Sequence, residues 1–522
     1  MNKIVLFGDS LTQFAQGPPR AMRGGGPGWG DCLVEYYARR ADVVNRGCFG
    51  YNTRDALEVD LIPRPSDDGE GEVLFATVLL GSNDACSIEL ERDGKHVDLV
   101  EYGRNLHELL VRARKLTSRV LVFTPPAMDL AKYTDFRLNT VKKPVDRSND
   151  LVLPYVNVCL QVCRTSGLDC VNLYEQTVGC VDTLTGVDGL HFSESGDELM
   201  FQLVKQHVET NWPELAVHPD PNSRTYSNSA SVSAIAPYLP FWDKRTPNSA
   251  NGAELLNPKW KSQRPTIVLV GDSITQQSQG NPSWCANFGK SEHAGWGDML
   301  QAVYARRMDV INRGFSGYNS RWVVDFSDLL AGFGKVELYT LFLGANDATA
   351  CGEQHVPLAE YSNNMDTLIS QALRHSKRVL VIGPPPMCHT KYMQWRRNRR
   401  ENANKRDEEI LDRTYLLALQ YSNAAKALAA QHCVPFMDLF VLFGGEFSTL
   451  LSDGLHLNAQ GNQRVGTAVL ARVGKEWPEM ECSANPDYGY YGTTCPAFPP
   501  EQPWFQDLHL ANQKKQHKRV KL

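Results

Sequence analysis

Short hydrophobic runs, many of them rich in β-branched residues, alternate along the chain with longer stretches whose apolar residues recur at helical spacing. The runs predict buried strands, and the longer stretches, such as Gly103–Lys115 and Arg413–Ala430, predict amphipathic helices. The predicted strands are Ile4–Phe7, Val43–Asn45, Leu74–Leu80, Arg119–Phe123 and Asp169–Asn172, then Ile267–Val270, Val310–Asn312, Leu338–Leu343, Val379–Ile382 and Val434–Met437. This alternation predicts an α/β fold in each half, with a mostly parallel five-stranded sheet covered on both faces.

Four short strings recur in the second half of the chain, in the same order. They are Val5–Gln13 with Val268–Gln276, Asn45–Asn52 with Asn312–Asn319, Leu80–Ala85 with Leu343–Ala348, and Asp188–His191 with Asp453–His456. Their offset of 263 to 267 residues is far longer than the period of a solenoid and indicates duplication of a whole domain. The strings fall in the predicted loops at the carboxyl ends of strands, where sheets of this kind place their sites.

Two domains therefore account for most of the 522 residues. We assign residues 1–245 to the first domain, 246–264 to a linker, 265–510 to the second domain and 511–522 to a basic, disordered tail. The domain ends carry the Pro-rich aromatic segments Pro237–Trp242 and Pro499–Phe505, which we interpret as extended arms that pack a Trp back onto each domain.

Composition excludes several classes of protein. Hydrophobic residues make up 42% of the chain, as in ordinary globular proteins, and the net charge of −5 gives no attraction to nucleic acid or to anionic membranes. No stretch is long and apolar enough for a membrane span, and we expect no cleaved signal peptide, because Met1–Lys3 run directly into the first predicted strand. The thirteen cysteines are scattered, and Cys159 and Cys163 lack a matching His or Cys pair nearby, so we interpret them as free thiols rather than metal ligands. These features predict a cytoplasmic protein.

The repeated strings contain the residue types that acyl transfer by a serine enzyme requires. Ser10 and Ser273 follow a strand in a Gly-Asp-Ser turn, which would expose a nucleophilic hydroxyl. His191 and His456 follow Asp188 and Asp453 by three residues, so that one turn can bring carboxylate and imidazole together. Hydrogen-bond donors for a tetrahedral intermediate can come from the side chains of Asn83 and Asn346 and from the amides of Gly50 and Gly317.

This set of residues resembles the SGNH (GDSL) hydrolase superfamily, and within it the isoamyl acetate-hydrolysing esterase group. The closer resemblance rests on Gly28–Gly30, Tyr37–Arg40, Asn45–Gly47, Gly50–Thr53 and Thr124–Pro126, and on their counterparts Gly295–Gly297, Tyr304–Arg307, Asn312–Gly314, Gly317–Asn319 and Gly383–Pro386. It covers both halves except the linker and the tail. It implies two flavodoxin-like three-layer α/β/α domains, hydrolysis of small esters, and no metal or organic cofactor.

The resemblance also implies a role for each residue. Ser10 would be the nucleophile, His191 the base and Asp188 its orienting group. The amides of Ser10 and Gly50 and the side chain of Asn83 would form the oxyanion hole. Their counterparts in the second half are Ser273, His456, Asp453, Gly317 and Asn346. The loop after the nucleophile differs between the halves, being glycine-rich at Arg20–Pro27 and longer at Asn281–His293, so the two sites are expected to differ in specificity.

Alternatives remain open from the sequence. The same residues would serve an acyl thioesterase or a lysophospholipase, and one domain could instead be a non-catalytic binding module. The basic stretches Tyr133–Arg147 and Tyr392–Arg406 fit a solvated helix start, or a rim that attracts anionic substrates such as acyl-coenzyme A. The tail Lys514–Leu522 could act as a nuclear-import signal or as an imperfect peroxisome-type address.

Overall fold

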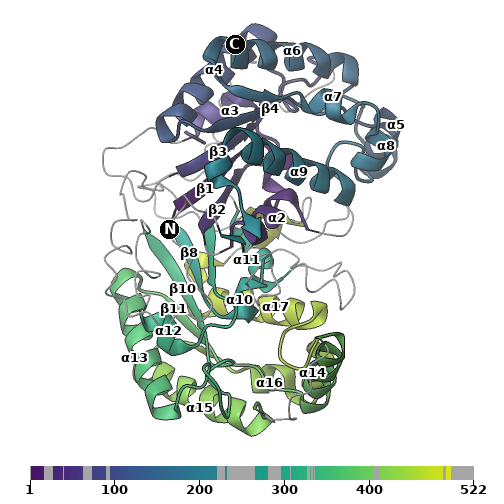
Figure 1. The fold of residues 1–522 in the computed structure, drawn as a ribbon. Coiled ribbons are helices and arrows are strands. Elements are labelled where there is room, and N and C mark those ends of the chain that lie inside the picture. The colour runs from purple at the N-terminus through teal and green to yellow at the C-terminus, as the bar shows by residue number, and fades with distance from the viewer. Residues whose placement is uncertain are drawn as a thin grey trace.

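A computed structural model describes most of both halves of the chain. It covers residues 2–16, 27–38, 40–62, 73–89, 95–219, 230–231, 265–279, 295–305, 307–325, 330, 333, 335–403, 412–481, 483–485 and 489–494. Each half forms a lobe around its own five-stranded parallel sheet (Figure 1), so the predicted fold class is confirmed. The predicted linker, both aromatic arm segments and the basic tail lie outside the described residues, and the proposed domain boundaries stay predictions.

The first lobe has the strand order β2-β1-β3-β4-β5. Its strands are β1 (Asn2–Gly8), β2 (Ala41–Gly47), β3 (Val73–Leu79), β4 (Val120–Phe123) and β5 (Asp169–Val171). Its α-helices are α1 (Ser10–Gln13), α2 (Trp29–Tyr36), α3 (Thr53–Glu58), α4 (Leu99–Leu116), α5 (Leu130–Asp135), α6 (Asn149–Ser166), α7 (Leu173–Thr177), α8 (Val181–Leu184) and α9 (Glu194–Asn211). A π-helical turn, η1 (Phe136–Thr140), continues α5, and a 3₁₀ turn, η2 (Pro213–Leu215), follows α9.

The second lobe repeats this arrangement in the order β9-β8-β10-β11-β12. Its strands are β8 (Thr266–Gly271), β9 (Asp309–Gly314), β10 (Val336–Phe342), β11 (Val379–Ile382) and β12 (Phe436–Met437). Its helices are α10 (Ser273–Gln276), α11 (Trp296–Tyr304), α12 (Ser320–Asp325), α13 (Leu358–His375), α14 (His389–Ala403), α15 (Tyr415–Gln431), α16 (Leu439–Phe443) and α17 (Ala459–Glu476), with 3₁₀ turns η6 (Gly444–Leu450) and η7 (Pro478–Met480). Two short antiparallel ladders, β6 (His218–Pro219) with β7 (Ala230–Ser231) and β13 (Ser483–Asn485) with β14 (Gly489–Thr494), lie near the lobe ends.

Helix α4 illustrates how the pattern produces the layers. Asp98 accepts hydrogen bonds from the amides of Val100 and Glu101 and thereby caps the helix start. The buried side chains Tyr102, Leu106, Leu109, Leu110 and Ala113 form one apolar stripe along it. Helices α3, α4 and α6 contribute to one hydrophobic cluster, and α2 and α9 contribute to another; side chains of β1 belong to both. No helix among the described residues is long and apolar enough to cross a membrane.

The two lobes meet at the edge strands β2 and β9 through reciprocal ion pairs. Arg46 of β2 lies 2.7 Å from Asp309 of β9, and Arg313 of β9 lies 2.8 Å from Asp42 of β2. All four side chains are at most 3% exposed. Asp42 corresponds to Asp309 and Arg46 to Arg313 in the duplication, so the contact has pseudo-twofold symmetry. One hydrophobic cluster also runs through both lobes and includes Val44 and Ile311 beside these ion pairs.

Four fully buried aspartates support the loops at the carboxyl edges of the sheets. Asp9 and Asp272 accept from the amides of Leu11 and Ile274 and cap α1 and α10. Asp84 accepts from the amide of Thr53 at 3.0 Å and from its hydroxyl at 2.5 Å, and so ties the loop after β3 to the start of α3. Burial raises the pKa of Asp9 and Asp347 to about 6 and that of Asp84 and Asp272 to about 7, although their hydrogen bonds act in the opposite direction.

Removing one charge of a reciprocal ion pair is expected to destabilise the fold. Asp309→Asn leaves the guanidinium of Arg46 buried beside a neutral group, which should lower the free energy of unfolding by about 3 kcal/mol. Urea denaturation followed by circular dichroism measures this. The control is Glu101→Gln, which removes the partly exposed partner of Arg54 and should cost less than about 1 kcal/mol. Equal losses in the two variants would contradict the importance of the buried pair.

The raised pKa values of the buried aspartates predict that the difference in stability between the wild type and Asp84→Asn depends on pH. The pKa of Asp84 is raised in the folded state, so its favourable contribution is present at low pH and is lost as the pH rises through about 7. Asparagine does not ionise. The stability of Asp84→Asn relative to the wild type should therefore increase by at least about 1 kcal/mol between pH 5.5 and pH 8.5. Denaturation curves at the two pH values test this, and a constant difference would refute it.

Candidate active sites

The two nucleophile candidates occupy equivalent positions directly after the first strand of each sheet. Strand β1 ends at Gly8 and Ser10 is the first residue of α1, while β8 ends at Gly271 and Ser273 begins α10. The aspartate between them caps the short helix, which fixes the serine at the carboxyl edge of the sheet. Both serines are 6% exposed.

The base and its orienting carboxylate lie in the loop before the last long helix of each lobe. Gly189 separates Asp188 from Leu190 and His191, and its φ of +70° is a left-handed conformation that favours glycine. A Cβ atom at Gly189 would lie 2.3 Å from the carbonyl oxygen of Asp129. Gly454 has the same role in the second lobe, with a φ of +91° and a Cβ position 2.4 Å from the carbonyl oxygen of Cys388. This glycine allows the tight turn that sets the spacing between Asp and His.

Each lobe brings a serine, a histidine and an aspartate into one chain of hydrogen bonds. Oγ of Ser10 lies 2.8 Å from Nε2 of His191, whose Nδ1 lies 2.5 Å from Oδ2 of Asp188. In the second lobe the corresponding distances are 2.8 Å from Ser273 to His456 and 2.6 Å from His456 to Asp453. The six residues predicted from the sequence are thus assembled as two separate triads, one in each lobe.

The electrostatics of both triads keep the aspartate ionised. Burial alone would raise the pKa of Asp188, but the adjacent His191 and hydrogen bonds from the amides of Leu190 and His191 hold it below the ordinary value. The same balance lowers the pKa of Asp453. An ionised carboxylate can only accept, so Nδ1 of the neutral imidazole carries the proton and Nε2 is left to accept from the serine. This is the tautomer that a general base needs.

In each lobe the predicted oxyanion-hole asparagine contacts the loop that carries the predicted glycine. Gly50 and Gly317 have φ values of +75° and +83°, which bend the loops after β2 and β9. Asn83 donates from Nδ2 to the carbonyl oxygen of Tyr51 at 2.8 Å, and Asn346 donates to that of Tyr318 at the same distance. The loop that carries each glycine is therefore tied to the asparagine expected to act with it.

Sequence reasoning missed one functional side chain in each lobe. Arg147 donates from Nη2 to Oδ1 of Asn83 at 2.8 Å, and Arg413 donates to Oδ1 of Asn346 at 3.1 Å. Both basic stretches of the sequence are thus close to this contact, but the counterpart of Arg147 is Arg413, which lies beyond Tyr392–Arg406. Each arginine directly precedes the residue that caps α6 or α15, namely Ser148 or Thr414. That shared position was the signal in the sequence.

One further arginine in each basic stretch forms an ion pair. Arg137 lies 3.0 Å from Asp146, and Arg396 lies 2.7 Å from Asp412. Asp146 also accepts from the hydroxyl of Tyr133 at 2.5 Å. These pairs hold the segments that lead into α6 and α15, and with them the arginines that contact the asparagines.

The walls beside the two histidines differ. Phe14 and Phe49 lie against His191, with ring centroids 4.7 and 6.2 Å away. Gln277 and Ser316 occupy the corresponding positions in the second lobe. The contrasting loops after the nucleophiles, Arg20–Pro27 and Asn281–His293, lie outside the described residues except for Pro27. The aromatic wall is thus a second difference between the sites, which the sequence comparison had not identified.

Comparisons with known proteins agree with the duplicated arrangement. Residues 4–204 match the GDSL-like lipase/acylhydrolase, and residues 269–464 match the GDSL-like lipase/acylhydrolase family. Similar curated proteins include an isoamyl acetate-hydrolyzing esterase 1 homolog from Rattus norvegicus, 35% identical over 41% of this chain and 81% of its own. The isoamyl acetate-hydrolyzing esterase of Saccharomyces cerevisiae is 34% identical over 37% of this chain and 80% of its own. The GDSL esterase/lipase CPRD49 of Arabidopsis thaliana is 28% identical over 49% of this chain and 97% of its own.

Each of these relatives corresponds in length to about one lobe of the present chain. Both halves match the family, and the relatives that exceed 30% identity are covered over four fifths of their length. The chain belongs to the GDSL-like (SGNH) lipase/acylhydrolase family, as a tandem pair of its domains, and is a carboxylic ester hydrolase.

Proposed function

We propose that the protein hydrolyses short-chain, acetate-type esters of small alcohols through an acyl-enzyme intermediate, at one active site in each lobe. The observation that carries this proposal is the complete Ser–His–Asp hydrogen-bond chain in both lobes, with 2.8 Å from serine Oγ to histidine Nε2 in each. The names of the relatives from Rattus norvegicus and Saccharomyces cerevisiae support a small acetate ester as the substrate.

The proposed reaction has two symmetrical stages. In the first, His191 takes the proton of Ser10 as the serine oxygen attacks the ester carbonyl, and Asp188 stabilises the resulting imidazolium. The imidazolium then gives its proton to the departing alcohol, which leaves an acyl group on Ser10. In the second stage His191 takes a proton from a water molecule as this water attacks the acyl group, and then gives the proton to Oγ of Ser10 as the acyl–oxygen bond breaks, so that the carboxylic acid leaves and the serine is regenerated. Ser273, His456 and Asp453 perform the same steps in the second lobe.

The negative oxygen of each tetrahedral intermediate requires aimed donors. The amides of Ser10 and Gly50 and Nδ2 of Asn83 supply them in the first site, and Ser273, Gly317 and Asn346 supply them in the second. One N–H of each asparagine amide is used by a backbone carbonyl, so the other is available for the oxyanion.

Arg147 and Arg413 act as positioning residues in this proposal. A guanidinium can only donate, so its contact with Oδ1 fixes which end of the asparagine amide is oxygen and which is nitrogen. Its positive charge also polarises the amide and makes Nδ2 a stronger donor. The arginine therefore serves the transition state without touching the substrate.

The aromatic wall favours different substrates at the two sites. Phe14 and Phe49 present apolar rings beside His191, whereas the polar residues Gln277 and Ser316 stand at the corresponding positions of the second lobe. We expect the first site to prefer the more hydrophobic ester of a pair. A thioesterase or a lysophospholipase remains the alternative within the same chemistry, because the catalytic groups would act on any activated acyl group.

Removal of the two serines separates the contributions of the lobes. Ser10→Ala and Ser273→Ala should each leave part of the turnover of p-nitrophenyl acetate, and the double variant should lose at least about a thousandfold, because no nucleophile remains. Initial rates with acetyl, butanoyl and octanoyl esters and with acyl-coenzyme A, measured on each single variant, give the preference of the site that is left.

Labelling with a fluorophosphonate and peptide mapping provides an independent count of reactive serines. Two labelled serines support two active sites. Label on one serine only would mean that the other lobe is a binding module, and wild-type turnover in the double variant would refute the proposal. Faster cleavage of acyl-coenzyme A or of octanoyl esters than of acetyl esters would favour the alternatives.

The role of Arg147 can be tested when the second site is inactivated. In the Ser273→Ala background, Arg147→Met should lower kcat about tenfold to a hundredfold and change KM little, because the asparagine loses its orientation towards the oxyanion. Arg147→Lys, which retains a donor and a charge, should recover part of the loss. Equal loss in both variants together with an unfolded circular dichroism spectrum would show a purely structural role, and an unchanged kcat in folded Arg147→Met would refute positioning.

A further inference from the structure

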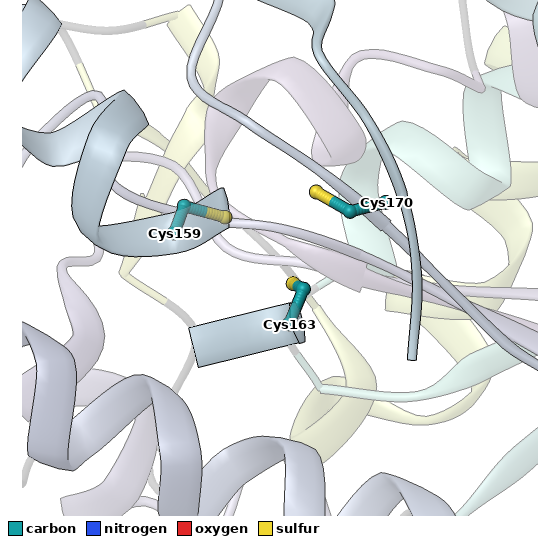
Figure 2. A group of neighbouring side chains, drawn as sticks. All are labelled: Cys159, Cys163 and Cys170. Carbon is teal, nitrogen blue, oxygen red and sulfur yellow. The ribbon is translucent and has the colours of Figure 1, made fainter. Parts of the chain in front are cut away.

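Three cysteine side chains converge between α6 and β5 of the first lobe. Cys159 and Cys163 are one turn apart on α6, and Cys170 lies on the edge strand β5. Their sulfur atoms all lie within 4.8 Å of one another, and Figure 2 shows the three side chains turned towards a common point. The sequence had suggested no partner for Cys159 and Cys163, because Cys170 becomes their neighbour only when β5 pairs with β4 beside α6.

The second lobe shows that this fold does not need thiols at these positions. Helix α15 corresponds to α6, since Tyr421 and Thr414 take the places of Tyr155 and Ser148. On that alignment Cys159, Cys163 and Cys170 are replaced by Ala425, Ala429 and Phe436. These three residues pack in the corresponding core of the second lobe, two of them fully buried. The cluster is therefore a property of the first lobe alone.

The three thiols differ in exposure. Cys159 and Cys163 are at most 1% exposed, while Cys170 is partly exposed.

We propose that Cys159, Cys163 and Cys170 bind one thiophilic divalent cation, with Zn²⁺ as the best fit, through three thiolate sulfurs and a water molecule. Zinc–sulfur bonds of about 2.3 Å in a tetrahedral site place the sulfurs about 3.8 Å apart, so only a small contraction of the cluster is needed. Three soft sulfur ligands select such an ion over Mg²⁺ or Ca²⁺, which prefer oxygen.

Charge balance distinguishes Zn²⁺ from a monovalent ion. Zn²⁺ held by three thiolates gives the site a net charge of −1. A cuprous ion held by three thiolates would leave a charge of −2 in the core of the lobe, which is costly where the surroundings are apolar. Bound zinc would join α6 to the edge strand β5 and leave the Ser10 site unchanged.

The residues at the corresponding positions of the second lobe provide the control variant. Cys159→Ala, Cys163→Ala and Cys170→Phe together copy the second lobe, whose core already packs these residues, so the triple variant is expected to fold. The full-length reduced protein is titrated with Zn²⁺ against a chromophoric chelator, and with Co²⁺ as a spectroscopic probe. A second control, Cys180→Ser with Cys433→Ser, removes exposed thiols outside the cluster.

Wild type and the second control should bind one Zn²⁺ per chain, at least a hundredfold more tightly than the triple variant. Co²⁺ should give sulfur-to-metal charge-transfer bands with an intensity typical of three thiolates, and Zn²⁺ should protect the partly exposed Cys170 from alkylation. Equal affinity in the wild type and in a folded triple variant would overturn the proposal, as would a Cys170 that is alkylated equally fast with and without Zn²⁺. Ester hydrolysis is measured in parallel, and its retention in every variant keeps this result separate from the proposed function.

Discussion

The parallel pairing of each first strand with its two neighbours is the constraint on which both sites depend. β1 pairs with β2 on one side and with β3 on the other, and β8 pairs in the same way with β9 and β10. Because the three carboxyl ends meet at one edge, the loops that carry Ser10, Gly50 and Asn83 are adjacent although they are far apart in the sequence. Buried Asp84 and the contact from Asn83 to Tyr51 then fix these loops to one another. The chemistry is thus positioned by the sheet and refined by a few buried polar contacts.

Much of this arrangement could be predicted because its signals are local. The strand β1 is a continuous apolar run, and Asp188 reaches His191 within a single turn, so spacing alone suggested the pair. Short sequence motifs that recur in the same order in both halves of the chain could then be distinguished from motifs that arise by chance. Specific long-range contacts are harder to predict. The position of Arg147 directly before the cap of α6 shows that it corresponds to Arg413, but not that it reaches Asn83, and the proximity of Cys170 to Cys159 arises from strand order.

The comparison of the lobes separates what the fold requires from what is particular to one copy. The triads, the asparagines and the arginines behind them are present twice, with distances that differ by at most 0.3 Å. The aromatic wall of Phe14 and Phe49 and the three cysteines of α6 and β5 are present once. The retained groups form the triads and the contacts around them, whereas the groups that differ lie beside the histidine of the first triad or in the core.

The symmetrical contact between β2 and β9 also bears on how the chain can change. Asp42 and Arg46 complement Asp309 and Arg313 in the way that two copies of one subunit would complement each other across a twofold axis. In a homodimer one segment of the gene would encode both β2 and β9, so a mutation would change both ion pairs together. In this chain separate segments encode the two strands, so one ion pair can change while the other is retained. A charge change on β2 nevertheless requires a matching change more than 260 residues away. The two lobes can therefore diverge in specificity, while the residues of β2 and β9 must continue to complement each other.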